Sequence, residues 1–261
     1  MMNSHFLVLY CLLQIPTEIG EMTSLGTINV ENNMLSGGLP SELANLSSKL
    51  QVVFLGNNRL SSSIPSEIGH LSNLHTLRLH QNSLTGTLPV EMGNWKRIVD
   101  LKVDHNSLSG SIASEIGLLG FNNTGASEED IGRLPNSDSI DLSHNLLSGS
   151  LPTELGLLTM WRSIDVQDNY LEGALPSELG SLADLEIFSA SSNQFSGSIP
   201  VQLVGLSNLT VFNVSDNRLT GQVPSGLCSL ARELGSGVDI FGLSFDCNST
   251  GLCGCDCECS N

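Results

Sequence analysis

A short phrase of the form NxLSG recurs eight times along this chain at nearly constant spacing. The positions of its asparagines differ successively by 25, 24, 24, 39, 24, 24 and 24 residues. Apolar residues stand eight, five and three positions ahead, as Leu74, Leu77 and Leu79 do before Asn82. A fixed period of this length is the mark of a solenoid, in which each repeat buries its apolar face against its neighbours. The asparagines are Asn33, Asn58, Asn82, Asn106, Asn145, Asn169, Asn193 and Asn217.

Each part of the repeat has its own structural preference. The alternation around LxL predicts a short strand with one face inward, and identical strands can pair from repeat to repeat. The asparagine suits the following turn, because its amide can bond the backbone of its own and the next repeat. Segments such as PSEIG predict a short helical turn with proline at its first position and an acid facing the helix dipole. We interpret the resulting glutamate column as solvated helix starts, with a calcium site as the alternative.

These features closely resemble the plant-type leucine-rich-repeat family, whose repeat reads LxxLxxLxLxxNxLSGxIPxxLGxL. The resemblance covers about residues 15–230 and implies an α/β repeat solenoid. Its form would be a right-handed superhelix with a parallel sheet on the concave face and short helical turns on the convex side. We therefore expect about nine rungs within 15–230. Residues 1–14 would be a weak signal-like or truncated segment, and residues 231–261 a cysteine-rich cap or tail.

The interval of 39 residues between Asn106 and Asn145 breaks the rhythm. It equals one repeat of 24 plus 15 residues, and the additional part lacks an LxxLxL segment. We expect residues near Phe121 to Glu129 to leave the solenoid as an acidic loop, so that the rungs of Asn106 and Asn145 pair directly. An irregular, degenerate rung near 118–135 is the alternative.

The outward positions of the strands predict a ligand surface on the middle rungs. These positions lie six, four, two and one before each asparagine, and charge and imidazole gather there on the middle rungs. If the additional residues loop out, His105 and His144 come to lie on neighbouring rungs. A metal site, a pH-sensitive contact and a merely solvated face are the alternatives for that pair. The candidate ligand-binding residues are Arg78, His80, Lys102, Asp104, His105, Asp141, His144, Asp165 and Asp168.

Charge and residue types limit the classes of function. The net charge is -17, from 27 acidic and 10 basic residues, which disfavours nucleic acid and anionic membranes as partners. No apolar run reaches the roughly 18 residues of a membrane span. Asp141, Ser143 and His144 are close in sequence, but strand alternation gives them no oxyanion pocket or buried base. We therefore expect a protein that is not an enzyme and that has no cofactor.

Six of the seven cysteines fall in the last part of the chain. A solenoid end exposes apolar side chains and strand edges, so a disulfide-tied cap in an oxidising compartment is the favoured interpretation. Six cysteines permit 15 pairings, and the sequence selects none of them. A thiolate metal cluster is the alternative. The cysteines are Cys228, Cys247, Cys253, Cys255, Cys257 and Cys259.

Sequons of the form N-x-S/T mark candidate glycosylation sites. A glycan at Asn213 would cover the C-terminal part of the concave face and direct binding toward its middle. The candidates are Asn45, Asn122, Asn208, Asn213 and Asn248.

The resemblance implies an extracellular or cell-surface recognition module without catalysis. Its ligand would be a protein, a peptide or a glycan held on the concave face, with a co-receptor as a further partner. An inhibitor of secreted cell-wall hydrolases, a structural or adhesive matrix protein, and an enzyme acting through His144 are the alternatives. The ligand itself depends on outward side chains that vary without disturbing the fold.

Overall fold

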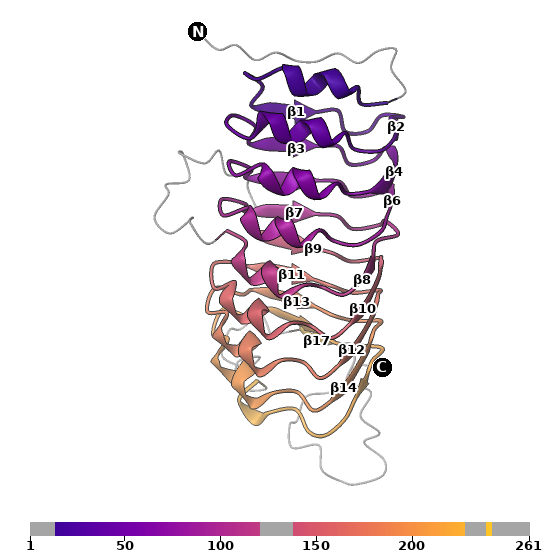
Figure 1. The fold of residues 1–261 in the computed structure, drawn as a ribbon. Coiled ribbons are helices and arrows are strands. Elements are labelled where there is room, and N and C mark those ends of the chain that lie inside the picture. Colours follow the sequence, from indigo (N-terminus) through magenta and orange to yellow (C-terminus); the bar gives the residue numbers. More distant parts are fainter. Residues whose placement is uncertain (1–13, 121–137, 228–238, 242–261) are drawn as a thin grey trace.

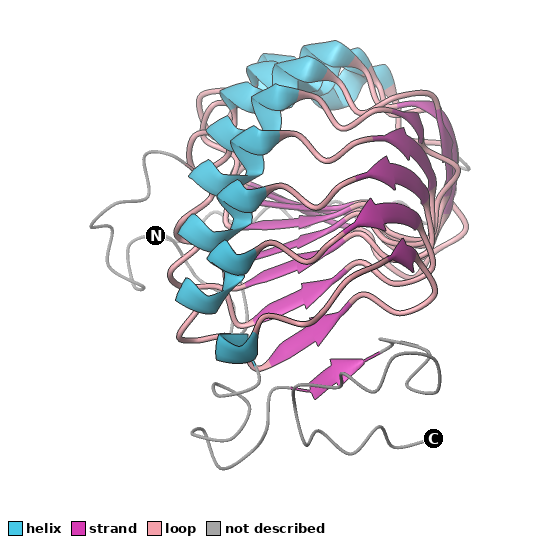
Figure 2. Ribbon diagram, turned by 90° about the horizontal axis from the view of Figure 1, so that it is seen from below, coloured by secondary structure: helices cyan, strands magenta, loops and turns pink. Residues whose placement is uncertain are grey.

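The computed structural model describes residues 14–120, 138–227 and 239–241, which form one elongated stack of rungs (Figure 1). In cross-section the stack has a main sheet on one side, short second strands on another and helical turns on the third (Figure 2). This arrangement is the repeat solenoid with a parallel sheet and short helical turns that the sequence predicts.

The main sheet has nine parallel strands, in the order in which they follow one another along the chain. Equivalent residues of successive repeats are register partners, as Leu77 and Leu101 are. Each rung therefore presents the same repeat position beside its neighbours. The strands are β1 (Thr27–Asn29), β3 (Val52–Phe54), β5 (Thr76–Arg78), β7 (Asp100–Lys102), β9 (Ser139–Asp141), β11 (Ser163–Asp165), β13 (Ile187–Ser189), β15 (Val211–Asn213) and β17 (Asp239–Phe241).

The LSG part of the repeat forms short second strands, which the repeat pattern did not predict. They pair in parallel into one group of three and one group of five, and an isolated bridge from Thr87 to Ser109 lies between the groups. Glycines such as Gly86 have φ of 79°, a left-handed conformation that favours glycine. The second strands are β2 (Ser36–Gly37), β4 (Arg59–Ser63), β6 (Ser83–Thr85), β8 (Ser109–Gly110), β10 (Leu146–Gly149), β12 (Tyr170–Gly173), β14 (Gln194–Gly197) and β16 (Arg218–Leu219).

The PSEIG-like segments form 3-10 helices on the convex side. Proline lies one position earlier than the sequence predicted: Pro65 is the N-cap, with φ -64° and ψ 137°, and η3 begins at Ser66. Its fixed φ thus orients an extended residue before the helix and not the first helical residue. The helices are η1 (Thr17–Glu21), η2 (Ser41–Leu46), η3 (Ser66–His70), η4 (Val90–Asn94), η5 (Ser114–Leu118), η6 (Thr153–Leu157), η7 (Ser177–Ser181) and η8 (Val201–Gly205).

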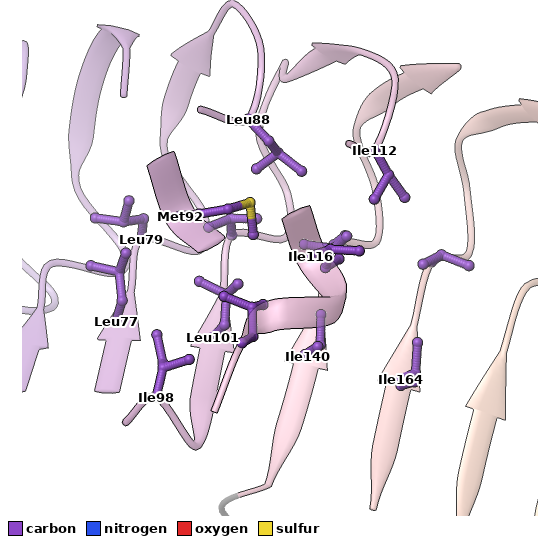
Figure 3. Packing of buried hydrophobic residues seen from close by; sticks show 14 of the residues in the cluster. Leu77, Leu79, Leu88, Met92, Ile98, Leu101, Ile112, Ile116, Ile140 and Ile164 are labelled. Atoms are coloured by element: carbon purple, nitrogen blue, oxygen red, sulfur yellow. The ribbon is translucent and has the colours of Figure 1, made fainter. Parts of the chain in front are cut away.

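The aliphatic positions of the repeat fill one continuous core between the three sides. Leu77, Leu79 and Leu101 are each at most 2% exposed, and they point into the same interior as Leu88 and Ile116 from the other sides (Figure 3). No helix of the described residues is long and apolar enough to cross a membrane.

The asparagines connect neighbouring rungs, as the sequence predicts, but the second rung is the preceding one and not the next. Asn82 Nδ2 donates to the carbonyl oxygens of Leu79 at 3.0 Å and of Leu55, on the preceding rung, at 3.1 Å. Its Oδ1 accepts from the backbone N–H of Leu60 at 2.9 Å. One amide thereby satisfies backbone groups of two rungs at the turn after the strand.

The rungs on either side of the long interval pair directly, as expected. Leu101 of β7 is the register partner of Ile140 of β9, and the N–H of Leu108 donates to Asn145 Oδ1 at 3.0 Å. The solenoid therefore continues across the interruption. The expected acidic loop, near residues 121–129, lies outside the described residues.

Candidate ligand-binding face

Three positions of the repeat place the candidate residues on the outward, concave face of the main sheet. Lys102, Asp141 and Asp165 end three neighbouring strands and are register partners, Lys102 with Asp141 and Asp141 with Asp165. Asp104 and His105 follow β7 in the chain. His144 and Asp168 occupy the same repeat position as His105, and they belong to the next two rungs. Direct pairing of β7 with β9 is what brings these residues together.

The Asp141 and Asp165 carboxyls lie side by side in a partly dehydrated setting. Burial raises the pKa of Asp165 to about 7, and the negative charges of Asp141, Asp104 and Asp168 raise it further. A hydrogen bond from the backbone N–H of Gln167 acts in the opposite direction. Burial also raises the pKa of Asp141, which accepts from Ser143 Oγ at 2.7 Å and from the Ser143 N–H at 3.1 Å.

His105 and His144 lie against each other on adjacent rungs. Their ring centroids are 4.1 Å apart, with an angle of 36° between the ring planes. His105 Nδ1 is 3.0 Å from Asp104 Oδ2, and His144 Nδ1 is 3.3 Å from Asp168 Oδ2. Both histidines have φ of 51°, because the chain turns there toward the asparagine. The two tilted imidazoles thus lie between two carboxylates.

Arg78 is engaged within the protein. Its Nε is 2.7 Å from Asp100 Oδ2, and its guanidinium lies 4.7 Å from the centre of the Phe54 ring. Asp100 is fully buried and also accepts from Ser139 Oγ at 3.1 Å. The sequence placed Asp100, six residues before its asparagine, among the outward positions, and this was wrong: burial beneath Arg78 makes it a support for that guanidinium.

His80 contacts the preceding rung. Its Nε2 is 3.2 Å from Asn57 Nδ2, and its ring occupies the space that a side chain at Gly56 would need. Asp104 and Ser143, two residues before their asparagines, are also buried, although that repeat position was expected to face outward. Close packing against neighbouring rungs covers these shorter side chains.

The described residues of this face form neither a three-residue metal-ligand group nor a hydrogen bond between Ser143 and His144. Within the described residues, no group of three or more His, Cys, Asp and Glu side chains is placed to hold a metal ion. The Ser143 hydroxyl donates to Asp141, so it is not held by His144 as a nucleophile would be held by its base.

Three of the five sequons lie in the described residues. Asn45 and Asn208 are exposed, and Asn208 Nδ2 donates to the Ala183 carbonyl oxygen at 3.0 Å. Asn213 is half-buried on the main sheet and its Nδ2 donates to Ser191 Oγ at 3.3 Å. Asn122, Asn248 and the six C-terminal cysteines lie outside the described residues, so both interpretations of the cysteines remain predictions.

Comparison with known proteins gives a consistent family. A family model described as Leucine Rich Repeat matches residues 24–46, 49–71, 73–95, 138–158 and 208–230. A search of curated proteins found no match.

Among solved structures, similar chains include plant receptor ectodomains. One is the ectodomain of the membrane receptor kinase GASSHO1/SCHENGEN3 from Arabidopsis thaliana in complex with CASPARIAN STRIP INTEGRITY FACTOR 2. It is 30% identical, with a TM-score of 0.67, and the match covers 83% of this chain and 27% of that chain. The Arabidopsis receptor kinase HAESA, in complex with the peptide hormone IDA and the co-receptor SERK1, is 30% identical with a TM-score of 0.63, over 88% and 39%.

A plant ice-binding protein is also similar. It is 26% identical with a TM-score of 0.59, over 81% of this chain and 70% of that chain. This chain therefore spans well under half of the two receptor ectodomains but more than two thirds of the ice-binding protein.

Proposed function

Since the chain is a leucine-rich-repeat protein with the plant-type repeat, we propose that it is a non-catalytic recognition module whose concave face binds a peptide ligand. The relatives GASSHO1/SCHENGEN3 and HAESA were solved with a bound factor and a bound peptide hormone, which supports this class of ligand. The proposal includes an extracellular or cell-surface location and, as for HAESA, a co-receptor as a further partner.

The observation that carries the proposal is the concentration of chemistry on one part of the sheet. Asp141, Asp165 and the histidine pair, His105 and His144, lie on neighbouring rungs, whereas Ser189 and Asn213 occupy the position of Asp141 further along. A flat sheet surface with a few convergent polar groups suits an extended segment that passes across several rungs.

A selection of random peptides on the full chain tests this function. Gln167→Trp would place an indole among the candidate residues, next to Asp165 and Asp168. Ser181→Trp would place the same side chain on the convex side, at the end of η7. We expect selected peptides to lose affinity for the Gln167→Trp variant and to keep it for the Ser181→Trp variant, as measured by fluorescence anisotropy.

Other outcomes separate the alternatives. Inhibition of a cell-wall hydrolase without selection of any peptide would favour an inhibitor, and self-association without a soluble ligand would favour a matrix protein. Equal loss of peptide affinity in both tryptophan variants would show that the concave face is not the binding surface.

Exposed hydroxyl groups at the ends of the second strands favour a second candidate function, binding to ice. They recur at one repeat position on rungs that stack about 4.8 Å apart, with a register offset by two residues, since Ser63 is the partner of Thr85 and Thr87 of Ser109. The similarity to the plant ice-binding protein, over 70% of that chain, supports this candidate. The exposed hydroxyl residues at this position are Ser63, Thr87, Ser111, Ser150 and Ser198.

Thermal hysteresis and growth shape of ice crystals test the second function. We expect the double variant Ser111→Lys and Ser150→Lys to abolish any effect on ice, because two long cations would interrupt the hydroxyl row. Ser114→Lys, at the start of η5, places a cation on the convex side as the control. Ice growth that the native chain leaves unaltered would eliminate this candidate.

A further inference from the structure

The middle of the concave face carries an excess of carboxylates, of which the charge of Lys102, the register partner of Asp141, offsets only a part. Asp141 and Asp165 are register partners on adjacent strands, and Asp104 lies on the preceding rung; we call these three residues the acidic ladder, and the charges of Asp104 and Asp141 both act on Asp165. Within the described residues, no ion pair joins Asp141 or Asp165 to a basic side chain. Arg78 is paired with the buried Asp100 and therefore contributes little positive charge to this face.

An exposed apolar pair, Leu146 and Tyr170, lies on the same two rungs as Asp141 and Asp165. Leu146 is 44% exposed and Tyr170 is 55% exposed. Both occupy the position just after the repeat asparagine, on adjacent rungs. The other rungs have Met34 and otherwise only polar residues at this position, which are Arg59, Ser83, Ser107, Gln194 and Arg218.

His144 and Asp168 lie between the acidic ladder and the apolar pair along the chain. His144 stands three residues after Asp141 and two before Leu146, and Asp168 stands likewise between Asp165 and Tyr170. Asp141 and Asp165 are register partners in the main sheet, whereas in the second strands the register is offset by two residues and Tyr170 is the partner of Ser148. Each of the two adjacent rungs nevertheless passes in the same order from a carboxylate, across His144 or Asp168, to an exposed apolar side chain, and we treat the two rungs as one strip.

We propose that this strip binds a peptide segment in which a lysine or arginine is followed closely by an apolar residue. The basic side chain reaches Asp141 and Asp165, and the apolar side chain covers the apolar pair. This inference rests on the proposed peptide-binding function and adds the chemistry of the ligand.

Charge complementarity selects this occupant over others. A guanidinium or ammonium donates to both neighbouring carboxylates at once, and partial burial strengthens the attraction relative to an exposed pair. Acidic peptides and phosphorylated segments meet like charge at the ladder. An apolar side chain on Leu146 and Tyr170 removes exposed apolar surface from water, which a purely basic segment would not do.

The test uses the full chain and three labelled octapeptides measured by fluorescence anisotropy. The probe is Gly-Ser-Arg-Leu-Arg-Leu-Gly-Ser, and the comparison peptides carry Gln or Glu in place of both arginines. We expect only the arginine peptide to bind, and the double variant Asp141→Asn and Asp165→Asn to lower its affinity about tenfold or more. Tyr170→Ser is expected to lower it as well, with no change of charge.

A matched control removes the same charge from the same two rungs on the opposite side. Glu154 and Glu178 lie in the first turns of η6 and η7, and the variant Glu154→Gln and Glu178→Gln is expected to bind the arginine peptide as the native chain does. Equal losses in the two double variants would overturn the proposal, because they would show attraction to the net charge of the whole molecule. Thermal unfolding verifies that each variant is folded.

The remaining outcomes separate this inference from the proposed function. If glutamine or glutamate peptides bind as well as the arginine peptide and lose affinity with Gln167→Trp, peptide binding by the concave face stands and the basic ligand is refuted. If neither these octapeptides nor randomly selected peptides bind, both proposals fail.

Discussion

At the scale of single residues, the polar side chains of this molecule act in two opposite ways. Asn145 is buried and fully engaged: its Nδ2 donates to carbonyl oxygens of Val103, Leu142 and Ser143, and its Oδ1 accepts from Leu108. Asp165 is partly buried and has no basic partner among the residues that the structure describes. The first arrangement stabilises the stack, while the second makes a charge costly at neutral pH.

Replacing Asp165 by asparagine is expected to stabilise the protein at pH 8 and not at pH 4. The pKa of this carboxyl is raised from 3.8 to about 7 by folding, so its favourable contribution is present below 3.8 and is lost as pH rises through 7. At about 1.4 kcal/mol per pKa unit, the raised pKa would lower the free energy of unfolding at pH 8 by about 4 kcal/mol. Screening by solvent at the open face reduces this effect to about 1 to 2 kcal/mol, which is the stabilisation expected for the asparagine variant.

Urea denaturation at the two pH values measures this difference. Asp216→Asn, an exposed position on the same face, serves as the control and is expected to change the free energy of unfolding little at either pH. A gain for Asp165→Asn that is the same at pH 4 and pH 8 would contradict the explanation from ionisation.

Asn145→Ala is expected to destabilise the protein by about 2 to 4 kcal/mol, because each buried backbone group left without a partner costs about 1 to 3 kcal/mol. The variant strands groups on both sides of the long interval, including the Leu108 N–H. Asn94→Ala, at an exposed residue of η4, is the control. A loss below about 1 kcal/mol in urea denaturation would show that water replaces the asparagine.

At the scale of elements, the repeat predicts what depends on neighbours alone. The register of Leu77 with Leu101 and the bonds of Asn82 follow from the period, because every rung meets an identical rung. The burial of Asp100 could not be predicted, since it depends on the single arginine at position 78. The contact of His105 with His144 was expected only on the condition that the long interval leaves the stack.

Deletion of residues 121–135 is expected to leave a folded and slightly more stable solenoid. Five residues, 95–99, connect η4 to β7, and the deletion would leave five, namely 119, 120 and 136–138, between η5 and β9. Shortening this connection from 20 residues to 5 lowers the entropy cost of closure by about 1 kcal/mol. Circular dichroism and urea denaturation measure the result.

A deletion of equal length inside a rung provides the contrast. Removing residues 83–97 takes away β6 and η4, so it leaves neighbouring rungs without partners and is expected to abolish cooperative unfolding. If both deletions unfold the chain to the same extent, residues 121–135 are part of the structural array, and the interpretation as an interruption is wrong.

At the scale of the whole molecule, negative charge acts on both sides of the solenoid. The chain has a net charge of -17, with the acidic ladder on the concave face. In the described part of the chain, seven of the eight 3-10 helices have a glutamate in their first turn. Each glutamate is favourably placed at the start of its own helix, but the glutamates of successive rungs repel one another. Folding into a stack therefore concentrates like charge along two lines.

Added salt is accordingly expected to raise the melting temperature at pH 7. Between 20 mM and 500 mM NaCl the screening length falls from about 20 Å to about 4 Å, which removes repulsion between successive rungs and beyond. A pH of 4 is close to the ordinary pKa of aspartate and glutamate, so the chain then carries less negative charge. The increase in melting temperature should therefore be smaller at pH 4. Calorimetry at both pH values measures the effect.

An equal increase in melting temperature at pH 4 and pH 7 would assign the effect to general salting-out of apolar surface. A decrease at pH 7 would mean that attractive ion pairs outweigh the repulsion.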